Sequence, residues 1–427
     1  MNEGLISESK PIKTPFYYGW IVLFIAALSY FFSGPGQTFS VSIFIDHYIA
    51  KFGWSRSLIS SMYSIATLIS GLILTGVGKY IDKLGHRKMI GIISIIFGLA
   101  CFWMSIVFNP LMIFIGFFLL RLMGQGSMTL IPQTLIPHWF KQKRGLALSI
   151  MGIGVVLSSS LLPPVNNWLI KSYSLGFTWR FWGILLIFFM APVGWFFVRN
   201  RPENIGLKPD GIKEDDTNDS FSSRVHISNA PWTLKQAMTT RAFWFMIYCS
   251  VVPALVNTGL VFHMVSIITE KGFSSGFAAY ILSITAMVRF PITFLAGYIL
   301  DRAKVHVVRG LNFILLTGAI ILLFQANSKI TLIIYALIHG IYMAFSSVSN
   351  GVLWPNYFGR KNLGSIRGFA ATAMVIGSSL GPLPFGMSYD IFGGYREVML
   401  AILILPTLAI VASLLSPPPK YNKEWTK

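Results

Sequence analysis

The feature that most constrains this chain is a series of long apolar stretches separated by short polar ones. A helix needs about 20 residues to cross a bilayer. Stretches of that size lie at about 18–45, 56–78, 89–108, 111–137, 145–170, 178–198, 241–269, 275–300, 310–327, 330–355, 365–389 and 396–416. Backbone groups in lipid must be hydrogen-bonded within the protein, so each stretch is predicted to be helical. We therefore predict an all-α membrane protein with twelve transmembrane helices.

Charge and cysteine content limit the partners and cofactors. Only 11% of the residues are charged, against roughly 25% in soluble domains. The net charge of +19 is divided among short loops, which suits anionic membrane lipid and not nucleic acid. Cys101 and Cys249 both lie within apolar stretches, so neither a disulfide nor a metal site is expected. No cofactor motif is visible.

The positions of lysine and arginine predict the orientation in the membrane. With a cytoplasmic N-terminus, the segments on that side carry 25 basic residues and those on the other side carry 7, when Arg309 is counted with a loop at 302–309. Basic residues favour the cytoplasmic side, so both termini are predicted to be cytoplasmic. The first apolar run is too long for a cleaved signal peptide, and the short loops favour the plasma membrane as the location.

The second half of the chain repeats the first at a shift of 219 residues. Gly53-Trp54-Ser55 aligns with Gly272-Phe273-Ser274, and Gly78-x3-Asp82 aligns with Gly297-x3-Asp301. Parallel repeats of this kind predict a substrate site between the halves near the middle of the membrane. The predicted organisation is a tail (1–17), a six-helix bundle (18–198), a cytoplasmic linker (199–240), a second bundle (241–416) and a tail (417–427).

One polar motif resembles the signature between spans 2 and 3 of the major facilitator superfamily. It reads Gly78-Lys-Tyr-Ile-Asp82-Lys83-Leu-Gly85-His-Arg87-Lys88, and Gly297-x3-Asp301-Arg302 resembles the partial copy between spans 8 and 9. The resemblance implies a transporter of two six-helix bundles and not an enzyme. It also implies a gating role, since glycines allow close helix approach and the aspartate can pair with arginines or a helix N-terminus. The gating candidates are Gly78, Asp82, Gly85, Arg87, Asp301 and Arg302.

Several local patterns resemble the monocarboxylate transporter family and the neighbouring oxalate/formate antiporter family. They are Tyr18-Gly19-Trp20, Phe52-Gly-Trp-Ser-Arg-Ser57, Arg289-Phe-Pro291 and Gly381-Pro382-x3-Gly386-x3-Asp390. In both families an arginine of span 8 anchors the carboxylate, and Arg289 matches it. Two departures are visible. Thr285 stands where the animal monocarboxylate transporters carry aspartate, and Arg367 at the cytoplasmic end is the one basic residue at 365–389, where the oxalate transporter has a second cation.

Arg289 is a candidate cargo anchor on physical grounds as well. It precedes Asp301 by 12 residues, which places it about 18 Å into the membrane at 1.5 Å per residue. Burying its permanent charge costs at least about 2.5–3.5 kcal/mol, and no acid lies within a span except near its outer end. A cargo carboxylate fits the guanidinium fork. The alternative is pairing with backbone carbonyls beside Pro291.

Two candidates of the first half have alternative interpretations. Arg121 either adds positive potential to a cavity and orients Gln125, or ties helices together. Gln37 follows Gly34-Pro35-Gly36, which is either a cavity-lining break or a simple kink.

Four candidates lie in the second half. Asn257 and Tyr342 either contact cargo or form hydrogen bonds between helices. His263 and His339 are the candidates for proton coupling because histidine titrates near neutral pH, and His263 is also a candidate cargo contact. For both histidines the alternative is structural hydrogen bonding.

These observations predict a secondary active transporter that moves a small organic monocarboxylate, of the lactate, pyruvate or acetate class, by alternating access. We expect co-transport with a proton and function as a monomer. Exchange of one carboxylate for another is the main alternative. Export of a drug or lipophilic solute is a further one, although cation exporters place acids in their spans.

Overall fold

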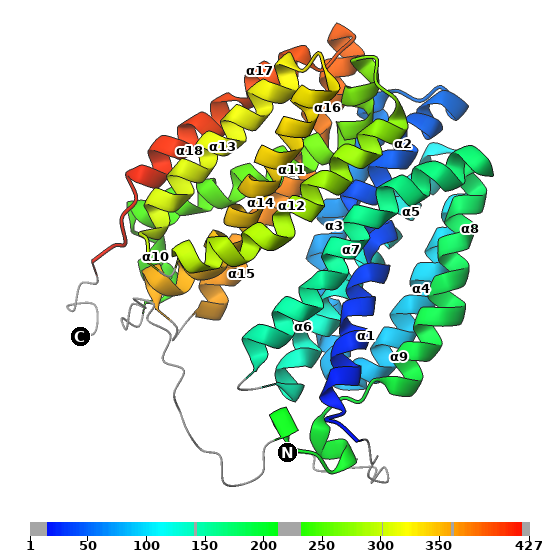
Figure 1. Cartoon of the computed structure of the whole chain (residues 1–427), viewed down its shortest axis with the longest axis vertical. Helices are drawn as coiled ribbons and strands as arrows, with labels where there is room; N and C mark the ends of the chain where they lie inside the picture. The colour runs from blue at the N-terminus through cyan, green and yellow to red at the C-terminus, as the bar shows by residue number, and fades with distance from the viewer. Residues whose placement is uncertain (1–14, 141–142, 212–231, 301, 360–362, 421–427) are drawn as a thin grey trace. The chain divides into compact units, whose positions relative to one another are not determined.

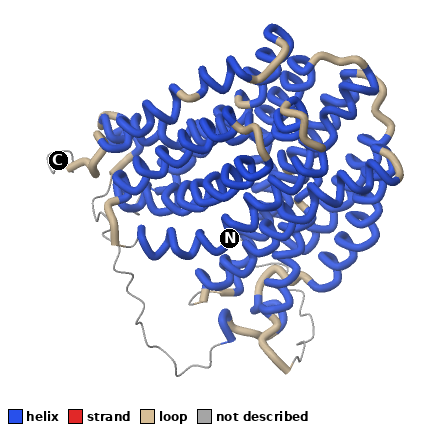
Figure 2. Tube along the Cα trace, turned by 45° about the horizontal axis from the view of Figure 1, so that its top comes forward, coloured by secondary structure: helices blue, strands red, loops and turns tan. Residues whose placement is uncertain are grey.

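The computed structural model describes residues 15–140, 143–211, 232–300, 302–359 and 363–420 (Figure 1). Within these ranges the regular structure is entirely helical, with loops between the helices (Figure 2). Asp301, the central part of the linker (212–231) and most of both outer tails lie outside the described residues. The all-α prediction is therefore confirmed for the part of the chain that is described.

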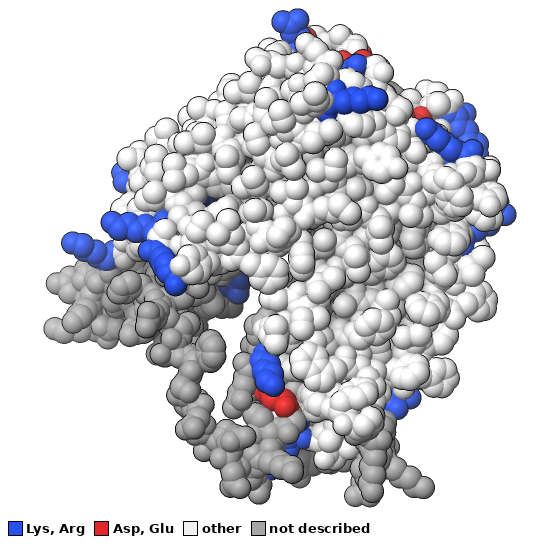
Figure 3. Space-filling model, in the orientation of Figure 1, with Lys and Arg blue, Asp and Glu red and all other residues white. Residues whose placement is uncertain are grey.

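Twelve segments among the described residues are long and apolar enough to cross a membrane. They are Gly19–Phe52, Arg56–Leu74, His86–Ser105, Pro110–Trp139, Leu146–Ser172, Leu175–Phe197, Arg241–Glu270, Ser275–Leu300, Val305–Gln325, Lys329–Phe358, Ser365–Phe392 and Arg396–Leu414. On the face seen in Figure 3, the charged side chains gather near helix ends and most of the surface is uncharged. This is the distribution expected for helices whose middle sections lie in lipid.

The helices form two compact units. The first contains the described residues of 1–47 and 69–221, and the second those of 48–68 and 222–427. The predicted linker (199–240) is described only in part, so the bounds of the two predicted bundles stay a prediction. In addition, the segment 48–68 belongs by its contacts to the second unit, although it lies in the first half of the sequence.

The first unit is built mainly from helices that run the length of a span, several of which are interrupted. Its elements are α1 (Gly19–Phe32), η1 (Gly34–Gly36), α2 (Thr38–Phe52), α3 (Arg56–Leu84), α4 (His86–Ser105), α5 (Pro110–Leu119), η2 (Leu120–Ser127), α6 (Met128–Trp139), α7 (Arg144–Ser172), α8 (Leu175–Leu185), η3 (Leu186–Met190), α9 (Ala191–Phe197), η4 (Pro202–Ile205) and η5 (Pro209–Gly211). The end of α2 and the start of α3 fall in the second unit. Within the first unit α1 packs on α7, and α4 packs on α8.

The second unit contains the five helices that surround the candidate site. Its elements are α10 (Leu234–Met238), α11 (Arg241–Glu270), α12 (Ser275–Leu300), α13 (Val305–Gln325), α14 (Lys329–Phe358), α15 (Leu363–Leu380), α16 (Pro382–Phe392), α17 (Arg396–Ile402) and α18 (Ile404–Leu414). Helix α14 packs on both α12 and α13, and α11 packs on α15. These pairings bring together side chains that are distant in the sequence.

The first turn of α3 is capped by a side chain of α16. The carboxylate of Asp390 accepts hydrogen bonds from the backbone N–H groups of Arg56 (3.1 Å) and Ser57 (2.7 Å). The guanidinium of Arg56 lies over the ring of Tyr389, 4.2 Å from its centroid, and donates to Ser266 Oγ at 2.7 Å. A carboxylate at a helix N-terminus accepts hydrogen bonds from the free backbone N–H groups and interacts favourably with the positive end of the helix dipole. These contacts explain why the segment 48–68 belongs to the second unit.

Candidate functional site

A cavity of about 280 Å³ lies among α11–α15 in the second unit. It is small in comparison with typical ligand pockets, so it suits a small solute. The polar side chains of its wall come from all four helices α11–α14: Ser250, Asn257, Thr258, Arg289, Arg309, Ser346, Ser347 and Asn350. Two of these residues are arginines, and none of the described residues that line the cavity is acidic.

Arg289 lies in α12, two positions before the internal proline Pro291. Its side chain is partly exposed, on the wall of the cavity. Among the described residues, its guanidinium forms no hydrogen bond or ion pair. In particular, it does not donate to the backbone carbonyls beside Pro291. The ring of His339 lies near this guanidinium. A guanidinium in this setting is free to bind an anion in the cavity.

Arg309 lines the cavity, and its predicted place in a cytoplasmic loop is wrong. Helix α13 begins at Val305, and Arg309 is only 3% exposed. Its Nη2 atom donates to the carbonyl of Cys249 at 2.8 Å and to Ser250 Oγ at 2.9 Å. Its Nη1 atom is buried and has no hydrogen-bond partner among the described residues. With Arg309 inside a span, the predicted cytoplasmic segments carry one basic residue fewer, and they still carry most of the basic residues.

A hydrogen-bonded chain connects the cavity wall to a buried histidine of α14. Asn257 lines the cavity, and its Oδ1 lies 3.0 Å from Nε2 of His339. The Nδ2 of Asn257 donates to the hydroxyl of Tyr342 at 3.4 Å. The other ring nitrogen of His339 lies 3.4 Å from the hydroxyl of Tyr335. Thus two predicted candidates, Arg289 and Asn257, line the cavity, and His339 and Tyr342 are each one hydrogen bond from it.

The remaining histidine candidate lies in a separate cluster. His263 is fully buried, and its Nε2 is 3.1 Å from both Ser60 Oγ and the carbonyl of Pro382. Its Nδ1 lies 3.1 Å from the hydroxyl of Tyr395. His263 does not line the cavity, and its contacts join the start of α3 to α11 and α16 within the second unit.

The first-unit candidates meet at the break in the first span. Arg121 lies in the π-helix η2, is 4% exposed and donates from Nη1 to Thr38 Oγ1 at 3.2 Å. Gln37 follows the 3₁₀ turn η1, and its Nε2 donates to Ser33 Oγ at 3.2 Å. A Cβ on Gly36 would meet the backbone of η2, so glycine permits the close packing of the two irregular segments. π-Helical turns are frequent at functional sites.

The gating motif between α3 and α4 is anchored through its arginine. The backbone N–H of Arg87 donates to Asn200 Oδ1 at 2.9 Å, and its Nε donates to the carbonyl of Trp195 at 2.6 Å. Gly85 has a φ of 81°, a left-handed conformation that favours glycine at this turn. Asp82 is exposed.

The partial copy of the motif is only partly described. Asp301 lies outside the described residues. Arg302 donates from Nη1 to the carbonyl of Tyr298 at 3.1 Å and lies over the ring of that residue, 3.7 Å from its centroid. A Cβ on Gly78 or Gly297 would meet no atom within 4 Å.

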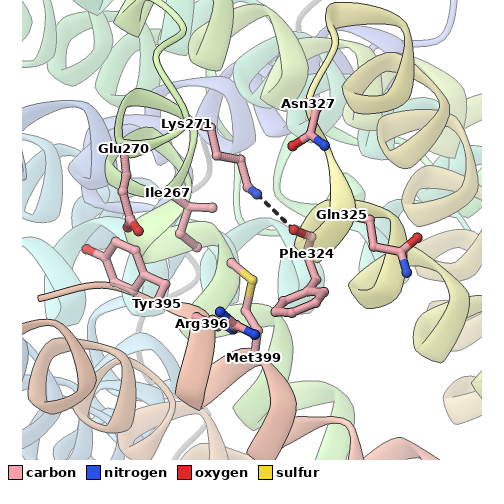
Figure 4. A pocket seen from close by; sticks show the side chains of 9 residues that line it. All are labelled: Ile267, Glu270, Lys271, Phe324, Gln325, Asn327, Tyr395, Arg396 and Met399. Carbon is pink, nitrogen blue, oxygen red and sulfur yellow. Dashed lines mark hydrogen bonds between the residues drawn. The ribbon is translucent and has the colours of Figure 1, made fainter. Parts of the chain in front are cut away.

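A second cavity, of about 430 Å³, lies where α11 ends and α17 begins (Figure 4). Its wall includes Glu270, Lys271 and Arg396, and the ammonium of Lys271 donates to the carbonyl of Phe324 at 2.9 Å. Burial lowers the pKa of Lys271, and nearby Glu270 opposes this shift. Because an acid accompanies the two cations, this cavity favours an anion less than the first one does.

Comparisons with known proteins agree with this architecture. Residues 19–382 match the family described as the Major Facilitator Superfamily. Monocarboxylate transporter 13 of Rattus norvegicus is 25% identical over 389 residues, which are 88% of this chain and 84% of the rat protein. The MFS transporter asaE of Aspergillus flavus is 25% identical over 198 residues, 45% of this chain and 44% of that protein.

The fold is also found in a solved transporter structure. A bacterial homologue of the human lysosomal transporter Spinster, solved in an inward-facing and unoccupied conformation, superimposes with a TM-score of 0.74. The two chains share 15% identity, and the superposition covers 95% of this chain and 98% of the other. Since the family match covers most of the chain and the twelve-span fold agrees with it, this protein belongs to the major facilitator superfamily of membrane transporters, which are not enzymes.

Proposed function

We propose that the protein is a secondary active transporter of a small organic carboxylate, and that Arg289 anchors the carboxylate group. The observation that carries the proposal is the cavity that contains two arginines and, among its described lining residues, no acid. A carboxylate satisfies a guanidinium through two parallel, charge-assisted hydrogen bonds. An organic cation would be repelled by the same wall, which argues against a cation exporter.

The monocarboxylate class is proposed on the similarity to the rat protein, whose name states that class. The local patterns around Arg289 support the same class. Co-transport with a proton is the proposed mode, with His339 as the proton carrier because its ring is bonded to the cavity residue Asn257. Carboxylate exchange remains the second candidate, since Thr285 is not titratable and so provides no proton carrier one turn from Arg289.

We further propose that the protein acts as a monomer in the plasma membrane with both termini in the cytoplasm. The excess of basic residues on one set of loops supports this orientation. The gating role of Gly78, Asp82, Gly85, Arg87, Asp301 and Arg302 is part of the same proposal, because these residues connect neighbouring spans on the proposed cytoplasmic side.

The test is uptake of labelled lactate, pyruvate and acetate by the purified protein in liposomes, with and without an inward proton gradient. We expect gradient-driven uptake by the wild type. Arg289→Gln is expected to reduce it at least about 30-fold, because truncating one partner of a buried charge pair costs about 2 kcal/mol or more. Uptake that needs internal carboxylate but no gradient would favour exchange.

The matched control is Arg180→Gln. Arg180 is exposed and donates to the carbonyl of Gly176 in its own helix, α8, so the change removes an arginine without touching the cavity. We expect wild-type uptake from this variant. Undiminished uptake by Arg289→Gln would refute the anchor, and the absence of carboxylate uptake by the wild type would refute the proposed function.

A further inference from the structure

The cavity of about 430 Å³ lies at one end of three membrane spans (Figure 4). Its wall includes the last residues of the spans that end at Glu270 and at Gln325, and the first residue of the span that begins at Arg396. The apolar residues of a span cross the hydrocarbon core, so the residues at its ends lie among the lipid headgroups. The cavity is therefore at headgroup depth.

Charges of both signs line this cavity without forming ion pairs. Lys271 directly follows Glu270, yet its ammonium donates to the carbonyl of Phe324 on α13 at 2.9 Å. The carboxylate of Glu270 accepts from the backbone N–H of Tyr395. Among the described residues, Glu270 forms no ion pair with Lys271 or Arg396. A ligand with separate positive and negative groups can pair with both kinds of charge, whereas a simple anion leaves the carboxylate without a partner.

The cations of the cavity have donors to spare. An ammonium has three N–H donors, and the carbonyl of Phe324 takes one from Lys271. The guanidinium of Arg396 forms no hydrogen bond among the described residues. The side-chain amides of Gln325 and Asn327 are also part of the wall. Phosphate oxygens accept charge-assisted hydrogen bonds from such groups, so these residues can hold a phosphate while Glu270 holds a cation.

Exposed apolar side chains lead from the cavity along two neighbouring helices. On α13, Ile321 lies one turn before Gln325 and is 39% exposed. On the last span, Leu400 lies one turn after Arg396 and Ile404 one turn further, and they are 48% and 60% exposed. Residues four apart share a helix face, and α13 and α18 run side by side (Figure 1). An occupant with acyl chains can lie along these apolar faces.

We propose that this cavity binds the headgroup of a phospholipid that carries both a phosphate and a primary ammonium, as phosphatidylethanolamine does. The phosphate accepts from Lys271 and Arg396, and the ammonium donates to Glu270. Phosphatidylcholine has the same phosphate, but its trimethylated ammonium has no N–H donor for the carboxylate. The inference concerns a lipid and not the cargo, so it goes beyond the proposed function and does not depend on Arg289.

The test measures lipid binding to the purified full-length protein in detergent by native mass spectrometry. Phosphatidylethanolamine, phosphatidylcholine and phosphatidylglycerol with identical acyl chains are titrated separately. We expect phosphatidylethanolamine to bind at least about tenfold more tightly than phosphatidylcholine, which corresponds to one hydrogen bond between charged groups. Equal binding of these two lipids would overturn the proposal, and so would tighter binding of phosphatidylglycerol, whose headgroup has no positive charge.

Variants assign the preference to the cavity. Glu270→Gln is expected to reduce the preference for phosphatidylethanolamine to less than about threefold, because the neutral amide no longer pairs with the ammonium. The matched control is Glu397→Gln, which removes an exposed acid of α17 that does not line the cavity, and it should keep the preference. Arg396→Gln should weaken both lipids by a similar factor, since both carry the phosphate. A preference that survives in Glu270→Gln would overturn the assignment.

A soluble analogue distinguishes a lipid from a free zwitterion. Glycerophosphoethanolamine has the same headgroup without acyl chains, and calorimetry should show it to bind at least about 100-fold more weakly than the lipid, because it buries no hydrocarbon. Equally tight binding would mean that the cavity takes a soluble zwitterion, which would overturn the lipid assignment. If Glu270→Gln does not fold, the comparison of the lipids on the wild type still decides the proposal.

Discussion

If the buried ring of His339 takes up a proton, it keeps its contact with the cavity wall. Asn257 uses Nδ2 to donate to Tyr342, so its Oδ1 accepts from Nε2 of His339. In the neutral ring Nδ1 is then an acceptor for the hydroxyl of Tyr335. A proton added at Nδ1 would point at the same tyrosine oxygen, which can also accept. The site therefore has a hydrogen-bond partner for both states of the ring.

At this residue we predict that His339→Gln uncouples transport from protons. The glutamine amide can still donate to Asn257 but cannot titrate near neutral pH. Exchange of internal for external carboxylate should continue, while stimulation of uptake by an inward proton gradient should be lost. Uptake in liposomes with an imposed gradient measures both, and His138→Gln, on the exposed side of α6, serves as the control. Unchanged stimulation in His339→Gln would exclude this histidine as the proton carrier.

At the scale of helices, the sequence determines the spans well because hydropathy is summed over about 20 positions. Hydropathy does not predict the start of α13, because Lys304 at its N-cap and His306 and Arg309 in its first turns give this segment the composition of a loop. The partners of Arg309 lie 59 and 60 residues earlier, in α11. No local pattern contains that contact, whereas Arg289 could be predicted because it interrupts an apolar stretch. If basic residues within five positions of an apolar run were counted as part of the span, Arg309 would be predicted to lie in a transmembrane helix.

Close packing of helices also depends on contacts that the sequence shows only as isolated glycines. A Cβ on Gly259 of α11 would lie 2.6 Å from the carbonyl oxygen of Gly381 and 2.5 Å from the ring of Phe385. A backbone oxygen cannot move aside as a flexible side chain can. A Cβ on Gly318 of α13, in contrast, would meet nothing within 4 Å.

We predict that Gly259→Ala destabilises the second unit by about 1–3 kcal/mol, the usual cost of overpacking. Gly318→Ala should be neutral or stabilising by up to about 1 kcal/mol, because alanine is the better helix former. The apparent melting temperature in detergent, followed by tryptophan fluorescence, compares the two variants. A Gly259→Ala protein as stable as Gly318→Ala would mean that α11 and α16 are not packed as closely as the structure indicates.

At the scale of the whole molecule, the positions of the basic residues predict how the chain is oriented across the membrane. The loops proposed as cytoplasmic carry most of the 34 lysines and arginines, and the insertion machinery retains such loops on the cytoplasmic side. The repeat and the two compact units do not predict the orientation, because the same fold can be inserted with either side facing the cytoplasm. Charge is therefore the property from which orientation can be predicted.

We predict that Lys208→Cys is protected and Lys329→Cys is labelled when intact cells are treated with a membrane-impermeant maleimide. Lys208 lies in the linker region and Lys329 at the start of α14, and both side chains are exposed. The two natural cysteines, Cys101 and Cys249, are fully buried, so the unmodified protein should give little background. Permeabilised cells should label both variants equally. The opposite pattern in intact cells would place both termini outside and would reverse the direction assigned to every loop, because an even number of spans keeps the two ends on one side.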